Sequence, residues 1–244
     1  AKLLMGSLKS RYRSFRGPFK HLWIERVGIP MRDIYIMAGG PTEHVPDLTA
    51  LNKPMIWVGV DKGISTLLAK GIMPDIVFGD FDSVDQASLK VIQHVEKYQY
   101  PAEKDDTDLA LALDWALQQK PDRILIFGNT GGRMDHTLAG VQLLLQDNSL
   151  RSKTIVQIVD ESNVIAAFLP GVYSVAALDS FKYISFFSMT AIVSDLTLRG
   201  FKYPLMNKEL RLGDTLCVSN ELILESGHFS FTDGILLMVR SMDK

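Results

Sequence analysis

Runs of apolar residues separated by polar turns divide most of the chain into two parts with different periodicities. In residues 31–160, short runs rich in Ile, Val and Phe alternate with stretches of strong helix formers. The short runs predict buried strands at residues 34–38, 55–60, 76–78, 98–100, 123–127 and 154–159. The stretches between them predict helices at about residues 64–70, 85–96 and 109–117, and another ending near residue 146. Strands alternating with helices are typical of a doubly wound, mostly parallel sheet, so we expect an α/β domain over residues 31–160.

The helical periodicity disappears after about Asp160. Turn pairs such as Pro170-Gly171 and Asp233-Gly234 then separate short apolar runs, at residues 172–175, 183–187, 191–193, 197–198, 215–218, 222–224, 228–232 and 235–239. Many short strands with turn residues between them are typical of an all-β sandwich or barrel. We therefore expect a second domain of this sandwich or barrel-like class over residues 161–244.

Residues 1–30 differ from both parts, because seven Lys or Arg residues face a single acid, Glu25. A basic arm that contacts nucleic acid or lipid would have this composition, and so would an amphipathic targeting sequence. A convincing first strand begins just after Met31. We therefore favour a third explanation, that this basic extension is a start-site artefact that is not part of the native fold.

The overall composition excludes several classes of protein. The 244 residues are 47% hydrophobic and 22% charged, as in ordinary globular proteins, and the net charge of −2 gives no pull toward nucleic acid or membrane. The longest apolar stretch, around residues 164–178, is interrupted by Pro170-Gly171 and is not expected to span a bilayer. The single cysteine, Cys217, excludes an intramolecular disulfide and favours a cytoplasmic protein.

Acidic residues gather at two of the predicted strand-to-helix junctions. Residues 79–83, Gly-Asp-Phe-Asp-Ser, follow a predicted strand. In an extended backbone Asp80 and Asp82 would share one side, while Phe81 would point into the fold. Residues 104–108, Lys-Asp-Asp-Thr-Asp, precede a predicted helix. Each cluster alone could be an ordinary turn or helix cap.

The second cluster adds Asp105 and Asp108, which share a helical face if the first turn begins there. Acids that converge repel one another unless a cation offsets their charge or some of them take up protons. Carboxylate oxygens suit Mg²⁺, which commonly takes one or two carboxylates and then substrate phosphates. Two such clusters at the mouths of α/β units favour a metal–phosphate site.

A glycine-rich segment, residues 128–133, joins another predicted strand to its helix. Glycines let backbone N–H groups approach a phosphate closely, and Arg133 can bind phosphate oxygens with both arms of its guanidinium. The segment matches neither the Walker A pattern nor G-x-G-x-x-G. Asp135 could be a further acid near the metal or a partner of the helix dipole, and His136 a hydrogen-bonding residue or a base. Lys104 and Asp61 lie on the same predicted rim, where turn chemistry is the alternative role for Asp61.

These motifs, in this order and spacing, resemble those of thiamine pyrophosphokinases. The resemblance covers residues 31–240 and rests on segments 38–40, 61–63, 79–83, 104–108, 131–136 and 219–221. It implies transfer of the β,γ-pyrophosphoryl group of ATP to the hydroxyl of thiamine, with release of AMP. It also implies a homodimer in which the α/β domain of one chain and the β domain of the other form each active site.

The resemblance also assigns roles to individual residues. Asp80, Asp82, Asp105 and Asp108 would hold Mg²⁺ and the ATP phosphates, with Asp135 nearby. It places Thr107 and Arg133 at the phosphates, and Ser219 and Asn220 at thiamine. Together with the residues argued above, the set expected at the ATP phosphates is Asp61, Lys104, Thr107, Gly131, Gly132, Arg133 and His136, and the set expected at thiamine is Ser219, Asn220 and Tyr203.

Two positions depart from the family pattern. Gly140 stands where related sequences usually carry Asn, and Tyr203 supplies the ring where a tryptophan often stacks on thiamine. Two other functions remain open from the residues alone. A Mg²⁺-dependent phosphohydrolase could use Asp80 as its nucleophile, and a non-catalytic protein could sense nucleotide or thiamine.

Overall fold

The computed structural model describes residues 32–82, 84–99, 106–178 and 180–243. The first part of the chain forms six strands, β1 (Asp33–Met37), β2 (Ile56–Val60), β3 (Ile76–Gly79), β4 (Glu96–Gln99), β5 (Arg123–Phe127) and β6 (Ile155–Val159). Between them lie five α-helices, α1 (Gly63–Ala69), α2 (Gln86–Val91), α3 (Asp108–Gln118), α4 (Met134–Leu144) and α5 (Asp147–Leu150). Two short 3₁₀ helices, η1 (Thr42–His44) and η2 (Leu48–Ala50), lie between β1 and β2. The predicted basic extension falls outside the described residues.

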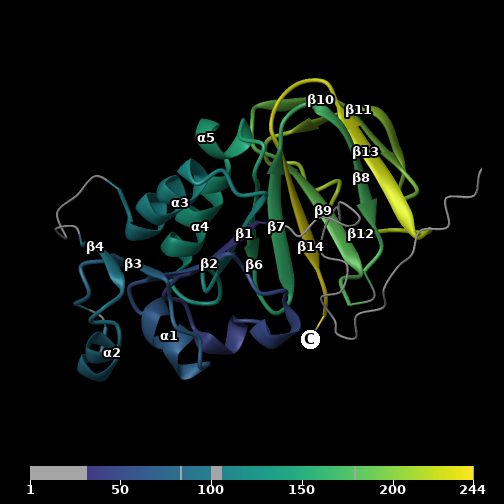
Figure 1. Cartoon of the computed structure of the whole chain (residues 1–244). Helices are drawn as coiled ribbons and strands as arrows, with labels where there is room; N and C mark the ends of the chain where they lie inside the picture. Colours follow the sequence, from purple (N-terminus) through teal and green to yellow (C-terminus); the bar gives the residue numbers. More distant parts are fainter. Residues whose placement is uncertain (1–31, 83, 100–105, 179, 244) are drawn as a thin grey trace, which may run out of the picture.

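These six strands are parallel and lie in the order β6-β5-β1-β2-β3-β4. Successive side chains of a strand face opposite sides of its sheet. Accordingly, Ile34 and Ile36 of β1 pack with α3 and α4, while Tyr35 and Met37 pack with Leu67 of α1 on the other face. Figure 1 shows α3 and α4 on one side of the sheet and α1 on the other. The predicted doubly wound, mostly parallel sheet is confirmed.

The second part of the chain continues this sheet and adds a smaller one. Its strands are β7 (Asn163–Phe168), β8 (Gly171–Ala176), β9 (Tyr183–Ser188), β10 (Ile192–Arg199), β11 (Leu205–Arg211), β12 (Asn220–Glu221), β13 (Ser226–Phe231) and β14 (Leu236–Ser241). Strand β7 pairs antiparallel with β6, and β14, β9 and β12 follow, so one ten-stranded sheet crosses the molecule. Strands β11, β10, β13 and β8 form a separate antiparallel sheet.

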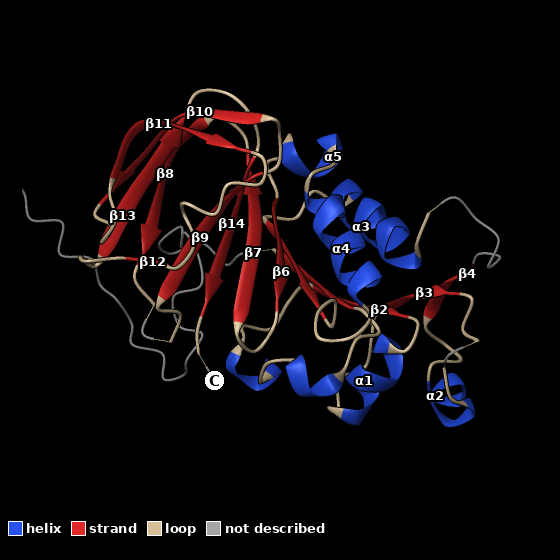
Figure 2. Ribbon diagram, turned by 180° about the vertical axis from the view of Figure 1, so that it is seen from behind, coloured by secondary structure: helices blue, strands red, loops and turns tan. Residues whose placement is uncertain are grey.

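The two antiparallel regions pack face to face as a sandwich. Phe186 of β9 and Met238 of β14 meet Leu198 and Phe229 of the smaller sheet in one apolar cluster. The sandwich lies at one end of the long sheet and the helices lie toward the other (Figure 2). The predicted sandwich is therefore correct as a class, although one of its layers is the continuation of the α/β sheet. The exact boundary between the two predicted domains stays a prediction.

Several local predictions were wrong. Residues 215–218 form a turn rather than a strand, after Gly213 at a φ of 93°. Residues 222–224 are mostly a bend, with one bridge from Leu222 to Phe201. The helix expected over residues 85–96 ends at Val91 because the chain turns and enters β4. The short strands expected at 191–193 and 197–198 are one strand, β10, with an irregularity at Asp195, whose φ is 56°.

Strands β7 and β11 were not predicted. Among the described residues, no helix is both long and apolar enough to cross a membrane.

Candidate active site

The carboxyl ends of β1, β2, β3 and β5 lie along one edge of the sheet. The chain runs from β1 toward β2, β3 and β4 on one side, and β5 pairs with β1 on the other, so the strand order reverses between β1 and β5. At this point two glycine turns touch, because the Gly40 N–H donates to the Gly128 carbonyl at 2.7 Å. Ligands of open α/β sheets bind at such a reversal. The edge is therefore the place to look for the predicted site.

Asp80 and Asp82 lie in a turn rather than in an extended strand. The Asp82 N–H donates to Asp80 Oδ1 at 3.0 Å, and Phe81 between them has a φ of 63°. The extended geometry assumed from the sequence is therefore wrong at Phe81. The expected burial of Phe81 is right, since its ring packs with Ile64 and Val84. Asp82 is exposed and Asp80 is partly buried, and the turn's hydrogen bond engages only one of the two Asp80 carboxylate oxygens.

The far end of this turn is fastened to α1. Asp85 caps α2 by accepting hydrogen bonds from the Ser88 N–H at 2.8 Å and from the Ser65 hydroxyl at 2.7 Å. The hydroxyl of Ser88 also donates to Asp85, at 2.5 Å. These hydrogen bonds hold the pKa of Asp85 far below its ordinary value. The ionised carboxylate of Asp85 thus anchors the chain just after the segment that carries Asp80 and Asp82.

Asp61 lies against the start of the same turn. Gly79 has a φ of 144°, and a Cβ placed there would overlap Oδ1 of Asp61. A glycine is therefore required at position 79, both by its backbone angle and by the neighbouring carboxylate. The structure brings Asp61, at the end of β2, next to the turn that carries Asp80, at the end of β3.

The second acidic cluster is described only in part. Thr107 caps α3, since its hydroxyl oxygen accepts from the Ala110 N–H at 3.2 Å, and Asp108 occupies the first turn. Asp106 is exposed and borders a hollow of about 380 Å³ beside α3 and α5. Lys104 and Asp105 lie outside the described residues. The capping role considered from the sequence therefore belongs to Thr107 and not to an aspartate.

In the glycine-rich turn, Arg133 is paired with Asp135. Its Nε donates to Asp135 Oδ1 at 3.1 Å and its Nη2 donates to Oδ2 at 2.5 Å. The arginine lowers the pKa of Asp135 from 3.8 to about 2, and the carboxylate raises the pKa of Arg133 in turn. The His136 N–H donates to Asp135 as well. Arg133 thus holds a carboxylate in the geometry with which it would hold a phosphate.

Two residues that were not among the predicted site residues, His44 and Asp160, contact this turn. The His44 ring lies against Gly131, where a Cβ would overlap it, and the Thr130 hydroxyl donates to Asp160 at 2.6 Å. Position 140 also has no room for a larger residue, because the buried side chain of Asn129 occupies the space that a Cβ on Gly140 would need. Asp160 could have been found from the sequence, because it follows a predicted strand, as Asp61 and Asp80 do.

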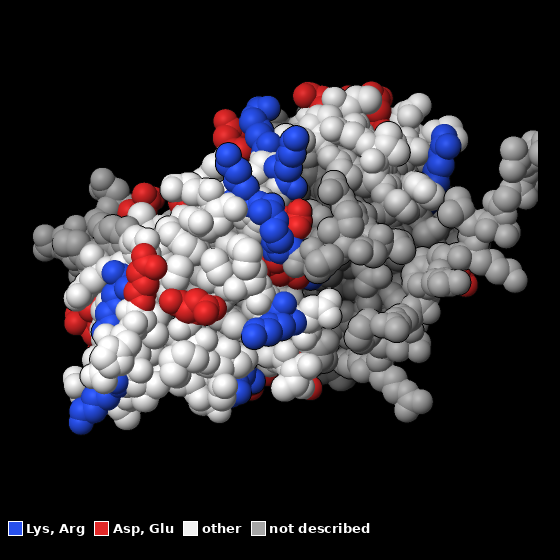
Figure 3. Space-filling model, in the orientation of Figure 1, with Lys and Arg blue, Asp and Glu red and all other residues white. Residues whose placement is uncertain are grey.

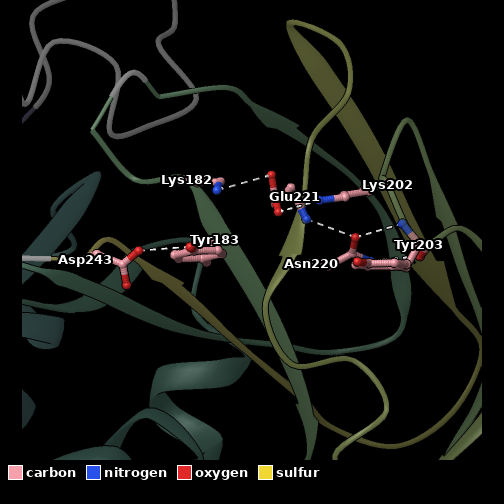
Figure 4. Close-up of polar contacts among 7 residues, drawn as sticks. All are labelled: Lys182, Tyr183, Lys202, Tyr203, Asn220, Glu221 and Asp243. Atoms are coloured by element: carbon pink, nitrogen blue, oxygen red, sulfur yellow. Dashed lines mark hydrogen bonds and ion pairs between the residues drawn. The ribbon is translucent and has the colours of Figure 1, made fainter.

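The residues expected at thiamine form a separate group near β12 (Figure 4). Asn220 is only 2% exposed, and both its amide oxygen and its amide nitrogen are hydrogen-bonded. Its Oδ1 accepts from the N–H groups of Tyr203 and Glu221, at 3.0 and 2.9 Å, and its Nδ2 donates to the Tyr203 carbonyl at 2.8 Å. Ser219 is exposed, and its N–H donates to Ser185 Oγ at 2.9 Å. Asn220 therefore acts on the backbone that carries Tyr203, which is itself 58% exposed.

The two groups of residues lie far apart within one chain. Strand β12 is one edge of the ten-stranded sheet, and β3, which leads to Asp80 and Asp82, is eight strand spacings away. At ~4.8 Å per spacing this is about 38 Å along the sheet. The chain thus brings Asp61, Asp80 and Asp82 to one end of the sheet and Tyr203 and Asn220 to the other.

No group of three or more His, Cys, Asp or Glu side chains suited to a metal ion occurs in the part of the chain that the structure describes. Mg²⁺ does not need such a cage, because it usually binds one or two carboxylates together with substrate phosphates. Carboxylates at the ends of β2 and β3, on the same edge of the sheet as the glycine-rich turn after β5, fit that mode. The face in Figure 3 carries Lys and Arg along the junction of helices and sandwich, with acids around them. An open α/β sheet with acids and a glycine-rich turn along the edge where its strand order reverses is the arrangement expected of an enzyme that handles a polyphosphate, a class that relies on positioning and charge neutralisation.

Comparison with known proteins gives the family. The model for "Thiamin pyrophosphokinase, catalytic domain" matches residues 48–156, and that for "Thiamin pyrophosphokinase, vitamin B1 binding domain" matches residues 174–236. The thiamine pyrophosphokinase of Bacillus subtilis is 48% identical over 216 residues, which cover 87% of this chain and all of that protein.

Solved structures agree with this assignment. A crystal structure of the Bacillus subtilis thiamine pyrophosphokinase superposes with a TM-score of 0.82 at 47% identity, covering 87% of this chain and 100% of that one. The enzyme from Geobacillus thermodenitrificans gives a TM-score of 0.79 at 45% identity, covering 87% and 98%. The chain belongs to the thiamine pyrophosphokinase family, as its motifs indicated.

Proposed function

We propose that this chain binds Mg²⁺-ATP at the carboxyl ends of β2, β3 and β5 and thiamine near β12 of a second copy. Its family makes it a thiamine diphosphokinase, which transfers the pyrophosphoryl group of ATP to thiamine and gives thiamine diphosphate and AMP. The family match over both parts of the chain carries this conclusion. Neither the phosphohydrolase nor the sensor considered from the sequence finds support in the comparisons.

On the phosphate side, Asp80, Asp82 and Asp108 would hold a divalent metal together with Asp105. Kinases of this kind generally work with such an ion, and we propose Mg²⁺ because the donors are carboxylate oxygens. The ion would neutralise the charge of the pyrophosphoryl group. Asp61 lies against the turn that carries Asp80 and would keep that turn in place.

Arg133 would bind the polyphosphate from the other side, together with Thr107, His136, Lys104 and the backbone of Gly131 and Gly132. Because Arg133 already holds Asp135 with two hydrogen bonds, the phosphate must either share the guanidinium or displace that carboxylate. The ionised Asp135 keeps the guanidinium oriented until the substrate arrives.

On the thiamine side, the ring of Tyr203 would stack on the cationic thiazolium, held in position by Asn220 and flanked by Ser219. Tyrosine attracts a cation by its π-face, though less strongly than tryptophan. These residues lie about 38 Å along the sheet from Asp82. Thiamine bound there cannot reach the phosphates of the same chain.

We therefore propose a homodimer in which each active site combines the strand ends of one chain with the β12 region of its partner. A set of large apolar side chains is exposed on β11 and the turns that follow it, and would supply apolar contact area to such an interface; it comprises Met206, Leu212, Leu216, Ile223 and Leu224. We also propose that the enzyme works in the cytoplasm, because its single cysteine suits a reducing compartment.

A first experiment tests the reaction. The purified chain is mixed with ATP, MgCl₂ and thiamine, and AMP and thiamine diphosphate are followed by chromatography with each component omitted in turn. Equimolar products that require all three components are expected. Release of phosphate without thiamine would instead support a phosphohydrolase, and binding of thiamine without turnover would support a sensor.

A second experiment tests the shared site. Asp82→Asn and Tyr203→Ala, each on its own, should be inactive or strongly impaired, since every site of either homodimer contains the defect. Mixing and re-equilibrating the two variants would give half mixed dimers, each with one intact site, and so about a quarter of the wild-type activity. If mixing restores nothing while chain exchange is demonstrated, the shared site is refuted.

A further inference from the structure

A cluster of charged and aromatic residues surrounds Glu221, opposite the segment that carries Tyr203 (Figure 4). Lys202 Nζ donates to Glu221 Oε1 at 2.9 Å, and Lys182 Nζ lies 3.8 Å from Oε2 of the same carboxylate. Glu221 also faces Tyr183 across the β12–β9 pair. One carboxylate therefore holds two lysines that come from different segments of the chain.

Each lysine also lies over the ring of the tyrosine that follows it. Lys182 Nζ is 5.0 Å from the centroid of the Tyr183 ring, and Lys202 Nζ is 5.6 Å from that of Tyr203. An ammonium group at this distance is attracted by the face of the ring. Glu221 is thus paired with the same two ammonium groups that lie over the aromatic faces.

The charges of the cluster cancel. Besides the two lysines and Glu221, the cluster contains Asp243, which accepts a hydrogen bond from the Tyr183 hydroxyl at 2.9 Å. Two positive and two negative groups give no net charge. The pairing also keeps the groups ionised, since Glu221 raises the pKa of Lys202 and Lys202 lowers the pKa of Glu221.

We propose that Glu221 is a specificity-determining residue, which neutralises Lys202 and Lys182 so that Tyr203 can accept a cationic aromatic ring. This inference rests on the proposed placement of thiamine at Tyr203. Without Glu221, the cluster would carry a net charge of +1, and an unpaired Lys202 would both repel a thiazolium and compete with it for the ring. Glu221 acts through the lysines and does not itself touch the substrate.

The test compares Glu221→Gln with Glu225→Gln in the full-length protein. Gln keeps the shape of Glu and removes one charge in both variants. Glu225 lies four residues further along, is exposed, and has a backbone carbonyl that accepts from Ala177, so its side chain serves as the matched control. The KM for thiamine, the KM for ATP and kcat are measured for each, with thermal unfolding as the check on folding.

We expect Glu221→Gln to raise the KM for thiamine by about fivefold, the factor associated with an exposed cation–π contact. The KM for ATP and kcat should stay within twofold, and Glu225→Gln should change none of the three. Adding Lys202→Gln to Glu221→Gln should restore the KM for thiamine, because the cluster is again neutral. The defect should also shrink at about 1 M KCl, where charges are screened beyond ~3 Å.

The double variant separates charge from structure. If Glu221→Gln leaves the KM for thiamine within twofold of the wild type, the inference is overturned. It is also overturned if the defect persists in the double variant or at high salt, because a loss of packing would not respond to either. If the wild-type protein forms no thiamine diphosphate, the proposed function fails first, and the failure is visible before any variant is made.

Discussion

The contact between the two glycine turns at the strand reversal gives a sharp prediction. In Gly40→Ala, the added Cβ would overlap the carbonyl oxygen of Gly128 and lie 2.9 Å from the carbonyl carbon and 3.2 Å from the Thr130 oxygen. These are backbone atoms, so the methyl group cannot be accommodated by turning a side chain. One of the turns must move, and with it the segment that leads to Arg133.

The neighbouring glycine provides the control. In Gly39→Ala, the closest approach of the new Cβ is 3.3 Å, to the Cβ of Lys62, and a shift of a few tenths of an ångström would relieve it. Overpacking typically costs about 1–3 kcal/mol. In a chain of 244 residues each kcal/mol lowers Tm by roughly 2–4 °C. We therefore expect Gly40→Ala to lower Tm by about 2–12 °C and Gly39→Ala to change it much less.

Activity should follow the same order. A displacement of about 1 Å in a positioning group can reduce turnover a hundredfold, so Gly40→Ala should lower kcat/KM for ATP far more than Gly39→Ala does. Differential scanning fluorimetry and the AMP assay measure both quantities. Equal Tm values and equal kcat/KM for the two variants would refute the contact between the turns.

The remaining predictions concern single contacts. Asp82→Asn should lower kcat by about a hundredfold or more. The Tm should stay nearly unchanged, because the backbone N–H of residue 82 still donates to Asp80. Near-normal turnover would refute the role of Asp82 at the metal. Asn220→Ala should raise the KM for thiamine and leave the KM for ATP unchanged. It should also cost about 0.5–1.5 kcal/mol for each hydrogen bond lost to the backbone of Tyr203. Equal effects on both KM values would contradict this. The carboxyl of Asp135 should titrate near pH 2 by NMR. Arg133 lowers the pKa of Asp135 in the folded chain, so the stabilisation from this ion pair is fully present above about pH 4 and is lost as the pH falls through about 2. A measured pKa of 4 or above would show that the ion pair does not form in solution.

Much of the α/β half could be predicted because most of its strands, unlike the exposed edge strand β4, are buried on both faces. Such strands are continuous apolar runs, like Ile124 to Phe127 in β5, and they stand out from the amphipathic helices beside them. The acids could be located for the same reason, since the end of a buried strand is visible in the sequence and fixes which edge of the sheet its loop occupies.

Of the two missed strands, β7 carries that signal in its apolar run Val164–Phe168, whereas β11 lacks it. Strand β11 is an exposed edge strand in which Leu210 is the single buried residue, so it has no apolar alternation to detect. The turn at Phe81 escapes for a different reason. Its positive φ is imposed by the hydrogen bond from Asp82 to Asp80 and by burial of the ring, and neither is visible in a residue type that rarely adopts that angle.

The continuity of the sheet could not be predicted at all, and it bears most directly on function. Two domains joined by a linker could fold toward each other and let Tyr203 approach Asp82 in one chain. Strands β6 and β7 are instead hydrogen-bonded neighbours, so the helical half and the sandwich share one sheet. This sheet is open, and β12 and β3 lie eight strand spacings apart in it. If both groups of residues serve one reaction, as we propose, the second group would come from another molecule, and this is the structural reason for proposing a homodimer.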